Sequence, residues 1–306
     1  MIKVKFWGVR GSIPCPGFAT AKYGGNTLCL ELRFNDANRT IIIDAGSGIR
    51  SLGNYLAAHD IPKGMKNIDI YLTHTHWDHI LGFPFFTPIY IPGMRIRIHG
   101  PKTFGDDSLE SVIGGQFVYR YFPVRIEELS SVIEYSELGE GRFDLGDGIT
   151  LVTKFLNHPI SCIGYRFEYR GKSFATVCDA EPFQNLFCTD PADPSYDRAA
   201  ALEGENAAAE QNMRVERFFA GADCIVYDAQ YTEEEYRNGK RGWGHSAIEY
   251  AIDAAARNGV AQLALIHHDP ERTDAQLDIL TEKLCNREHC GDMKAFFARE
   301  GMEIML

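Results

Sequence analysis

Residues 73–79 read THTHWDH and directly follow the apolar run NIDIYL, so three histidines and one aspartate crowd into six positions at the end of a strand. In extended backbone, side chains two positions apart point to the same side, so His74 and His76 can bind one ion. The turn that follows presents Asp78 and His79 to a second ion. The chain must therefore fold so that further ligands reach the end of this strand.

The donor types in this cluster restrict the metal. Imidazole and carboxylate suit zinc, iron or manganese, and the absence of cysteine from the cluster argues against a closed structural zinc site. Further donors follow other apolar runs: His158 in FLNHPISCIGYRF, Asp179 in SFATVCDAE and His267 in LALIHHDPE. A site with two metals, three donors for each ion and one bridge needs about this number of residues.

Strand-like and helix-like segments follow one another in two series. Apolar runs bounded by Gly, Pro, Asn and Asp predict strands, and they lie at 1–9, 27–34, 40–46, 67–74, 94–100, 148–156, 162–171, 172–180, 223–230 and 262–268. Helices are expected at 47–59, briefly after residue 79, and at 199–221, 246–259 and 274–288. This order predicts two packed sheets with helices on their outer faces.

The charge balance limits the partners. The chain has 31 Lys and Arg against 42 Asp and Glu, a formal net charge of -11, and contains no run of five basic residues. This composition disfavours long nucleic acids as partners. A small anionic ligand is still compatible with it, because a bound metal pair can set the local potential against the net charge.

The cysteines and the apolar runs bear on the compartment. The eight cysteines include no C-x-x-C pair, and several lie in apolar runs, which predicts reduced thiols in the core. No apolar stretch approaches the roughly 18 to 20 residues of a membrane span, and the N-terminus lacks the apolar region of a signal peptide. We therefore expect a cytoplasmic protein without a membrane partner.

The segment HTHWDH resembles the H-x-H-x-D-H signature of the metallo-β-lactamase superfamily, and the downstream residues fall in that superfamily's order. The resemblance spans nearly the whole chain. It implies an α+β fold, a four-layer αββα sandwich of two mixed sheets covered by helices. We expect one domain over 1–306 with insert or loop regions near 101–147 and 183–212.

The resemblance also implies a set of metal ligands. The segment NHPISCIGYRF resembles the one that carries the third histidine of the first ion, FATVCDAE resembles the Y-S-G-D-T-type segment with the bridging aspartate, and LIHHDPER resembles the terminal L-T-H-F-type segment. Two divalent ions are implied, zinc or alternatively manganese or iron. The first would be held by His74, His76 and His158, the second by Asp78, His79 and His267, and Asp179 would bridge them.

Two further residues are expected near these ligands without binding the metal themselves. The segment IIIDAGSG resembles the superfamily's strand-end aspartate, so Asp44 would orient the ligand loop. His268 competes with its neighbour His267 for the last ligand position. We prefer His267 because it directly follows the apolar strand, which leaves His268 as a solvated residue or as a support for the ligands.

The segment GWGHSAIEYAIDAAARNG is similar to the H-S-T-x-x-x-A segment of the branch that holds ribonuclease Z and the phosphonate-pathway cyclic phosphodiesterases. By this likeness His245 would stabilise charge on the phosphate or protonate the leaving oxygen, and Ser246 would cap the next helix. The alternative is a surface histidine at a helix start.

The opening, FWGVRGSIPCPGFATAKYGGNTLCLEL, is similar to the first hairpin of the same branch. Its glycine-rich turn would let backbone N–H groups approach a phosphate. Arg10, Ser12 and Asn26 are therefore candidate substrate contacts. The alternative is that the glycines only serve a tight turn.

The resemblance implies a metal-dependent phosphodiesterase in which a hydroxide bridging the metals attacks phosphorus in line, with Asp78 accepting the water's proton and His245 assisting the leaving alkoxide. The chain departs from ribonuclease Z because it has no glycine-rich, basic excursion comparable to the arm that grips transfer RNA. A small or cyclic phosphodiester is therefore the expected substrate. The alternatives are a carbonyl hydrolase of the lactonase or thioesterase type, and a metal-binding sensor without catalysis.

Two further segments have more than one interpretation. The polar stretch 183–212 is either a surface excursion or a lid or partner-binding insert. Relatives in the suggested branch often pair, and the aromatic stretch around Tyr119, Tyr121 and Phe122 is available for a homodimer contact, although core packing explains it equally well.

Overall fold

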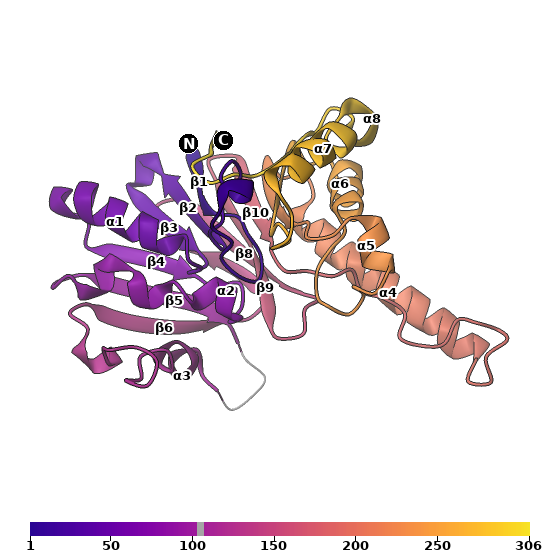
Figure 1. Ribbon diagram of the computed structural model, residues 1–306, viewed down its shortest axis with the longest axis horizontal. Coiled ribbons are helices and arrows are strands. Elements are labelled where there is room, and N and C mark those ends of the chain that lie inside the picture. Colours follow the sequence, from indigo (N-terminus) through magenta and orange to yellow (C-terminus); the bar gives the residue numbers. More distant parts are fainter. Residues whose placement is uncertain (103–106) are drawn as a thin grey trace.

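The structure, a computed structural model, describes residues 1–102 and 107–306. Two seven-stranded sheets pack face to face, and helices lie on the outer face of each sheet (Figure 1). The strands are β1 (Ile2–Gly8), β2 (Cys29–Phe34), β3 (Arg39–Ile43), β4 (Asn67–Tyr71), β5 (Arg95–Pro101), β6 (Val132–Leu138), β7 (Gly141–Asp144), β8 (Ile149–Leu156), β9 (Cys162–Tyr169), β10 (Lys172–Val177), β11 (Cys224–Asp228), β12 (Gln262–Ile266), β13 (Lys294–Phe297) and β14 (Glu303–Met305). The α-helices are α1 (Ile49–His59), α2 (Trp77–Ile80), α3 (Leu109–Gly114), α4 (Arg198–Phe219), α5 (Glu233–Arg237), α6 (Ile248–Arg257), α7 (Asp274–Leu284) and α8 (Arg287–Cys290).

Both sheets are mixed and have matching topologies. The first has the order β14-β1-β2-β3-β4-β5-β6 and the second the order β13-β12-β11-β10-β9-β8-β7. In the first sheet the pairs from β14 to β3 are antiparallel and those from β3 to β6 are parallel. In the second, the pairs from β7 to β10 are antiparallel and those from β10 to β13 parallel. The predicted pair of mixed sheets covered by helices is confirmed.

The apolar side chains form three layers of core, and these layers explain the sequence patterns. Strand β1 buries alternate residues, with Val4 and Phe6 between the two sheets. Helix α1 buries Leu52 and Leu56 on the outer face of the first sheet, at the spacing of one helix face. The parallel strands β11 and β12 are apolar throughout, because the other sheet covers one face and helices cover the other.

The region 101–147 is more than an insert. It contributes β6, which pairs with β5 at the edge of the first sheet, and β7, which pairs with β8 at the edge of the second. Both strands belong to the sandwich itself. The segment that we predicted as an insert or loop region therefore also supplies one edge strand to each sheet. Residues 103–106 of this region lie outside the described residues.

The stretch 183–212 divides into a loop and the first part of α4, which begins at Arg198. The loop and the start of α4 project from the body of the molecule (Figure 1). Asp197 caps the helix, since its carboxylate accepts hydrogen bonds from the backbone N–H groups of Ala199 and Ala200. Residues 186–212 carry six acidic side chains and one basic one, so this projection has a negative net charge.

Two expectations about the whole chain can be checked. All eight cysteines are free thiols, and five of them are buried. Cys15, Cys188 and Cys285 are only half-buried, so the prediction of core thiols holds for the other five. Within the described residues, no helix combines the length and the apolar character needed to cross a membrane.

Candidate metal centre

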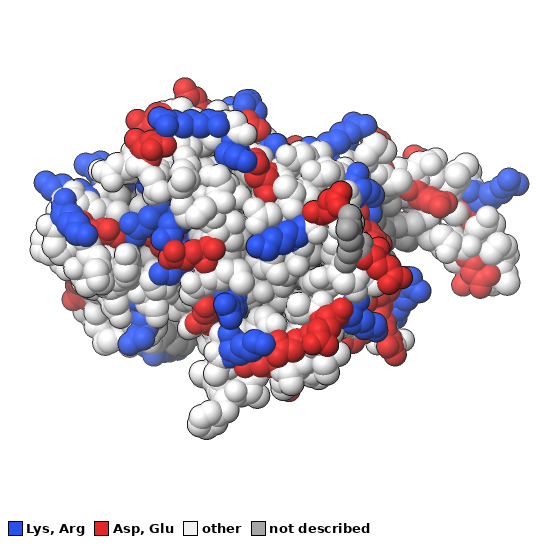
Figure 2. Space-filling model, turned by 90° about the horizontal axis from the view of Figure 1, so that it is seen from above, with Lys and Arg blue, Asp and Glu red and all other residues white. Residues whose placement is uncertain are grey.

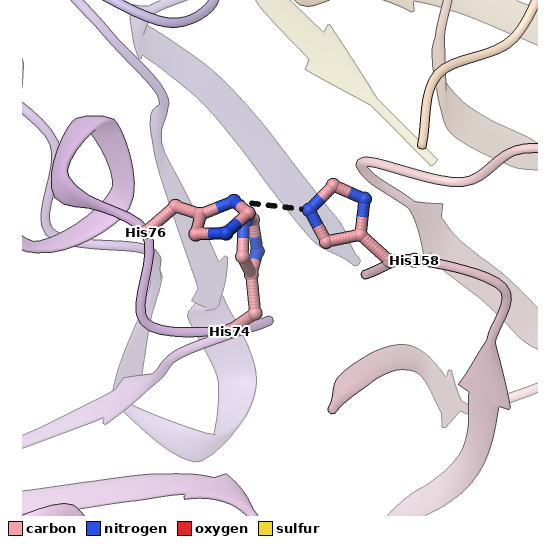
Figure 3. Close-up of side chains that lie close together, drawn as sticks. All are labelled: His74, His76 and His158. Atoms are coloured by element: carbon pink, nitrogen blue, oxygen red, sulfur yellow. Dashed lines mark hydrogen bonds between the residues drawn. The ribbon is translucent and has the colours of Figure 1, made fainter. Parts of the chain in front are cut away.

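Three histidines form the first group of donors. The loop after β4 brings His74 and His76, and the loop after β8 brings His158. Figure 3 shows their imidazoles turned toward one another, with Nε2 of His158 at 3.0 Å from Nδ1 of His76. One nitrogen of each ring lies within 4.8 Å of the others. This is the trio that the sequence assigned to a first ion.

The second group joins Asp78, His79, Asp179 and His267, all of them buried. Nε2 of His267 lies 3.2 Å from Oδ2 of Asp78. Nε2 of His79 lies 3.4 Å from the same oxygen. Asp78 and His79 come from the short helix α2, whereas His267 directly follows β12 in the other sheet.

The carboxylate of Asp179, a member of the second group, also lies close to the first group. Its Oδ2 is 3.6 Å from Nε2 of His74 in the first group and 3.2 Å from Nε2 of His267 in the second. Its Oδ1 is 3.2 Å from Nε2 of His79. Ligands about 2.1 Å from a tetrahedral ion stand roughly 3.4 Å apart, so these separations fit a carboxylate that bridges two ions.

The hydrogen-bonding state of the donors also fits a metal. Among the described residues, Nε2 of His74, Nε2 of His79 and Oδ1 of Asp179 are buried without a hydrogen-bond partner. Buried polar atoms are rarely left in that state unless an ion or a water satisfies them. Imidazole and carboxylate donors without a thiolate are suited to zinc, manganese and iron.

Burial and neighbouring charges set the protonation of these histidines. Burial lowers the pKa of His74 well below its usual value and that of His158 to about 4, so both rings are neutral, as metal ligands must be. Burial also opposes charge on His79 and His267. The neighbouring carboxylates, Asp179 foremost, outweigh it and raise the pKa of both rings well above the usual value. This excess of carboxylate charge favours a cation between them.

The comparisons with known proteins agree with this geometry. A family model described as a beta-lactamase superfamily domain matches residues 39–192, just over half of the chain. The chain belongs to this superfamily. A ribonuclease Z from Lactococcus lactis subsp. lactis (strain IL1403) is 25% identical over 270 residues, which cover 79% of this chain and 83% of that protein. This similarity supports a ribonuclease Z-like branch of the superfamily.

Solved structures share the fold of this superfamily member over its whole length. The metallo-beta-lactamase fold protein YhfI from Bacillus subtilis superposes with a TM-score of 0.64 at 16% identity and covers 100% of both chains. The short form of human tRNase Z superposes with a TM-score of 0.61 at 18% identity and covers 99% of this chain and 98% of that one. At these identities the likeness establishes the fold alone.

Asp44 contacts the candidate ligand loop at Thr73 and the candidate ligand His79. Its Oδ1 accepts a hydrogen bond from the backbone N–H of Thr73, and its Oδ2 accepts one from the hydroxyl of Thr73. Oδ2 also lies 2.8 Å from Nδ1 of His79. With Nδ1 occupied in this way, His79 directs Nε2 toward the metal position.

The structure distinguishes His267 from His268. His267 lies in the second donor group, whereas His268 points away and its Nε2 lies 2.8 Å from the carbonyl oxygen of Ala298. Burial lowers the pKa of His268 to about 3, so this ring is neutral and belongs to the core. Its neighbour is thus the only one of the two that faces the donors.

Strained backbone concentrates at the site. Of the seven non-glycine residues with positive φ in the described part of the chain, four lie here: Asp44 (59°), Asp179 (46°), His267 (60°) and Ser12 (61°). Such conformations are costly for L-residues and persist where the surrounding structure enforces them. Each of these residues lies just beyond a strand or in the first hairpin, so the strain aims side chains into the cluster.

A sixth imidazole, that of His245, adjoins the two donor groups, which together contain five. Its Nδ1 lies 2.9 Å from Oδ2 of Asp228 and 4.0 Å from Oδ2 of Asp179. Its ring lies against that of His267, with 4.7 Å between the ring centroids. Asp228 is a residue of the candidate site that the sequence reasoning did not name. It ends the apolar run CIVYD in the same way that Asp44 follows TIII, and this strand-end signal could have identified it.

The helix cap predicted for Ser246 is wrong. The N-cap of α6 is Ala247, and no side chain caps it. The hydroxyl of Ser246 instead donates to the carbonyl oxygen of Ala180 at 2.5 Å. Ser246 thus joins the loop that carries His245 to the segment after Asp179.

Two of the three residues predicted to contact substrate, Arg10 and Asn26, instead bind other parts of the protein. Arg10 is fully buried, and its guanidinium donates to the carbonyl oxygens of Gly24, Asp269 and Arg272. The side-chain amide of Asn26 donates to Glu300 at 2.9 Å. Both residues fasten the first hairpin to the C-terminal part of the chain.

Ser12, the third predicted contact, does lie at the site. It is exposed, and its backbone N–H donates to Oδ2 of Asp78 at 2.8 Å. Its hydroxyl lies 3.4 Å from Nε2 of Gln230. The contact with substrate stays a prediction for this residue.

Proposed function

We propose that this protein is a metal-dependent phosphodiester hydrolase that acts on a small or cyclic phosphodiester through two divalent ions. The observation that carries the proposal is the placement of His245 beside both donor groups, with its Nδ1 at 2.9 Å from Oδ2 of Asp228. His245 adds a sixth imidazole to the five of the donor groups, at a place from which it would assist the leaving oxygen of a phosphodiester. The ribonuclease Z relatives support the same reaction class.

The residues of the site would have different roles in such a reaction. Two ions held by the seven donors would polarise the phosphoryl oxygens and lower the pKa of a water molecule. His245 would stabilise charge on the phosphate or give a proton to the leaving oxygen, and Asp228 would orient its ring.

Asp78 suits metal binding better than proton transfer. Burial opposes its charge, but the nearby imidazoles of His79 and His267 outweigh burial and lower the pKa of Asp78 below the usual value. A carboxyl with a lowered pKa stays ionised and is a weak proton acceptor. We therefore propose that Asp78 acts first as a ligand, and that any part in accepting the water's proton is secondary.

The charge distribution supports a small substrate. The chain has a net charge of -11, and the projecting segment 186–212 has six acidic residues against one basic. On the face shown in Figure 2, Lys and Arg are interspersed with Asp and Glu. Phosphate backbones are gripped by clustered basic side chains. The relatives, however, are named as ribonucleases, which runs against the expectation of no long nucleic acid, so an RNA belongs in the test.

The proposal is tested by hydrolysis of bis(p-nitrophenyl) phosphate, a cyclic nucleotide, a transfer RNA precursor, a lactone and a thioester by the zinc-loaded protein. We expect phosphodiester turnover that falls at least about 100-fold in His245→Ala. His59→Ala, which removes an exposed imidazole at the end of α1, is the matched control. Turnover of the lactone or thioester alone would contradict the proposal, and efficient cleavage of the RNA precursor would contradict the small substrate.

A homodimer and a cytoplasmic location belong to the proposal as well. Of the aromatic stretch, Phe122 packs against Phe85 and Phe117, whereas Tyr119 and Tyr121 are exposed. The two tyrosines are therefore the residues available to a second copy of the chain. Sedimentation velocity of wild type and Tyr121→Ala tests this, and a monomeric wild type at micromolar concentration would contradict it.

A further inference from the structure

Glu181 is a buried carboxylate that gathers four hydrogen-bond donors. Its side chain is 7% exposed and lies two residues after Asp179. Oε1 accepts hydrogen bonds from the hydroxyl of Tyr236 at 2.7 Å, from the backbone N–H of Gly242 at 2.8 Å and from the amide of Gln184 at 2.9 Å. Oε2 accepts one from the backbone N–H of Gly244 at 2.9 Å. The two oxygens of a carboxylate offer enough acceptor positions for all four donors.

The loop that Glu181 holds is in direct contact with a candidate ligand. Nδ1 of His158 lies 2.9 Å from the carbonyl oxygen of Gly244. A Cβ atom on Gly244 would lie 2.4 Å from that nitrogen, and φ at Gly244 is +85°, so only glycine fits here. Because the carbonyl requires a proton on Nδ1, Nε2 of His158 carries its lone pair on the side of the first donor group, where it lies 3.0 Å from Nδ1 of His76.

The same loop carries His245, and its other end is tied to the same short segment. The hydroxyl of Ser246 donates to the carbonyl oxygen of Ala180. The backbone N–H of Ser246 and Nδ1 of His245 both contact Oδ2 of Asp228. The two residues after Asp179 thus fix both ends of residues 242–246.

We propose that Glu181 is a positioning residue for the metal centre. It fixes the 242–246 loop so that the carbonyl of Gly244 orients His158 toward the first ion and His245 stands beside both groups. The carboxylate reaches this loop at two places, through its hydrogen bonds with the backbone N–H groups of Gly242 and Gly244. The inference rests on the proposed metal centre, because it assigns His158 a metal to bind.

The test compares Glu181→Gln with wild type in zinc titrations against a competing chelator. The amide of glutamine would direct N–H groups at donors, so the loop should loosen. We expect the affinity for one of the two ions, the one held by His158, to fall about 10- to 100-fold, with the other unchanged. Glu31→Gln is the matched control, since Glu31 is also buried, at 2% exposed, but binds Trp7 and Arg33 in the first sheet.

Nitrogen NMR of the histidine rings gives a second readout that needs no activity. In metal-free wild type, His158 should be the tautomer with a proton on Nδ1, and Glu181→Gln should show a mixture. Unchanged affinity for both ions together with an unchanged tautomer would overturn the proposal, as would equal weakening of both ions in Glu181→Gln and Glu31→Gln. A wild-type protein that binds no zinc would instead overturn the metal centre on which it rests.

Discussion

Oδ2 of Asp44 lies 2.8 Å from Nδ1 of His79, and both side chains are fully buried. This contact fixes which nitrogen of His79 can face a metal. In Asp44→Asn the side-chain amide can keep the backbone conformation at φ 59°, which asparagine tolerates, but it no longer supplies the charge. We expect zinc affinity to fall about 10- to 100-fold in a chelator titration.

The control for Asp44→Asn is Asp147→Asn, because Asp147 also has a positive φ, 54°, but is exposed and lies far from the donors in the turn after β7. It should leave zinc affinity unchanged. Equal affinities for wild type and Asp44→Asn would show that Asp44 does not orient His79.

Gly11 makes a close approach to a candidate ligand. A Cβ atom at Gly11 would lie 2.3 Å from Nδ1 of His267. Gly11→Ala must therefore shift the ring or the first hairpin, and we expect zinc affinity and phosphodiesterase activity each to fall at least about tenfold, since ligand positions matter at the level of tenths of an ångström. In Gly17→Ala the nearest atom is 3.9 Å away, so this control should behave as wild type. Full zinc affinity in Gly11→Ala would contradict the tight packing on His267.

The interior of the fold could be predicted from the sequence, but its edges could not. Long apolar runs such as those of β4 and β12 are buried on both faces and stand out in the sequence. The edge strands β6, β7, β13 and β14 are short or half-exposed, so their apolar runs are brief or diluted by charged residues. The sequence therefore assigned β6 and β7 to an insert.

The candidate metal donors stand out in the sequence because they lie in the loops, or in the short helix α2, that follow the strands β4, β8, β10 and β12. The errors at Arg10 and Asn26 have a different cause. Arg10 also binds nearby Gly24, but its partner Arg272 lies 262 positions away and the Glu300 partner of Asn26 lies 274 positions away, and only the fold brings these residues together. Glu181 has the same property, since the Gly242 and Gly244 N–H groups that it binds are 61 and 63 positions away.

Trp77 is 82% exposed although it lies between the candidate ligands His76 and Asp78. An indole with so few packing contacts adds little to the stability of the fold. We therefore interpret the Trp77 ring as a surface on which an aromatic part of the substrate stacks. Trp77→Ala should keep its zinc content and melting temperature but lose about 1 kcal/mol of substrate binding, roughly a fivefold rise in KM for bis(p-nitrophenyl) phosphate. Ile279→Ala, at an exposed position on α7, is the control. An unchanged KM would rule out this contact.

Asp69 predicts a pH dependence that is independent of the metal centre. It is 3% exposed, and its carboxylate lies 2.6 Å from Nε of Arg97 and 3.2 Å from Nη2 of Arg39. Burial opposes its charge, but His99, Arg97 and Arg39 outweigh burial and lower the pKa of Asp69. Because the folded pKa is below the unfolded value of about 3.9, the contribution to stability is present above that pH and is lost as the pH falls through the folded pKa.

The free energy of unfolding of Asp69→Asn should therefore be lower than that of wild type by about 1–3 kcal/mol at pH 7. This is less than the roughly 3–5 kcal/mol for one partner of a fully buried pair, since Arg97 is 40% exposed. The difference should shrink as urea unfolding is repeated at lower pH down to 3. Asp36→Asn removes a carboxylate whose partner Arg170 is 64% exposed, and it should cost under about 1 kcal/mol at any pH. A deficit in Asp69→Asn that is the same at pH 3 and pH 7 would show that lost packing, rather than lost charge, is the cause.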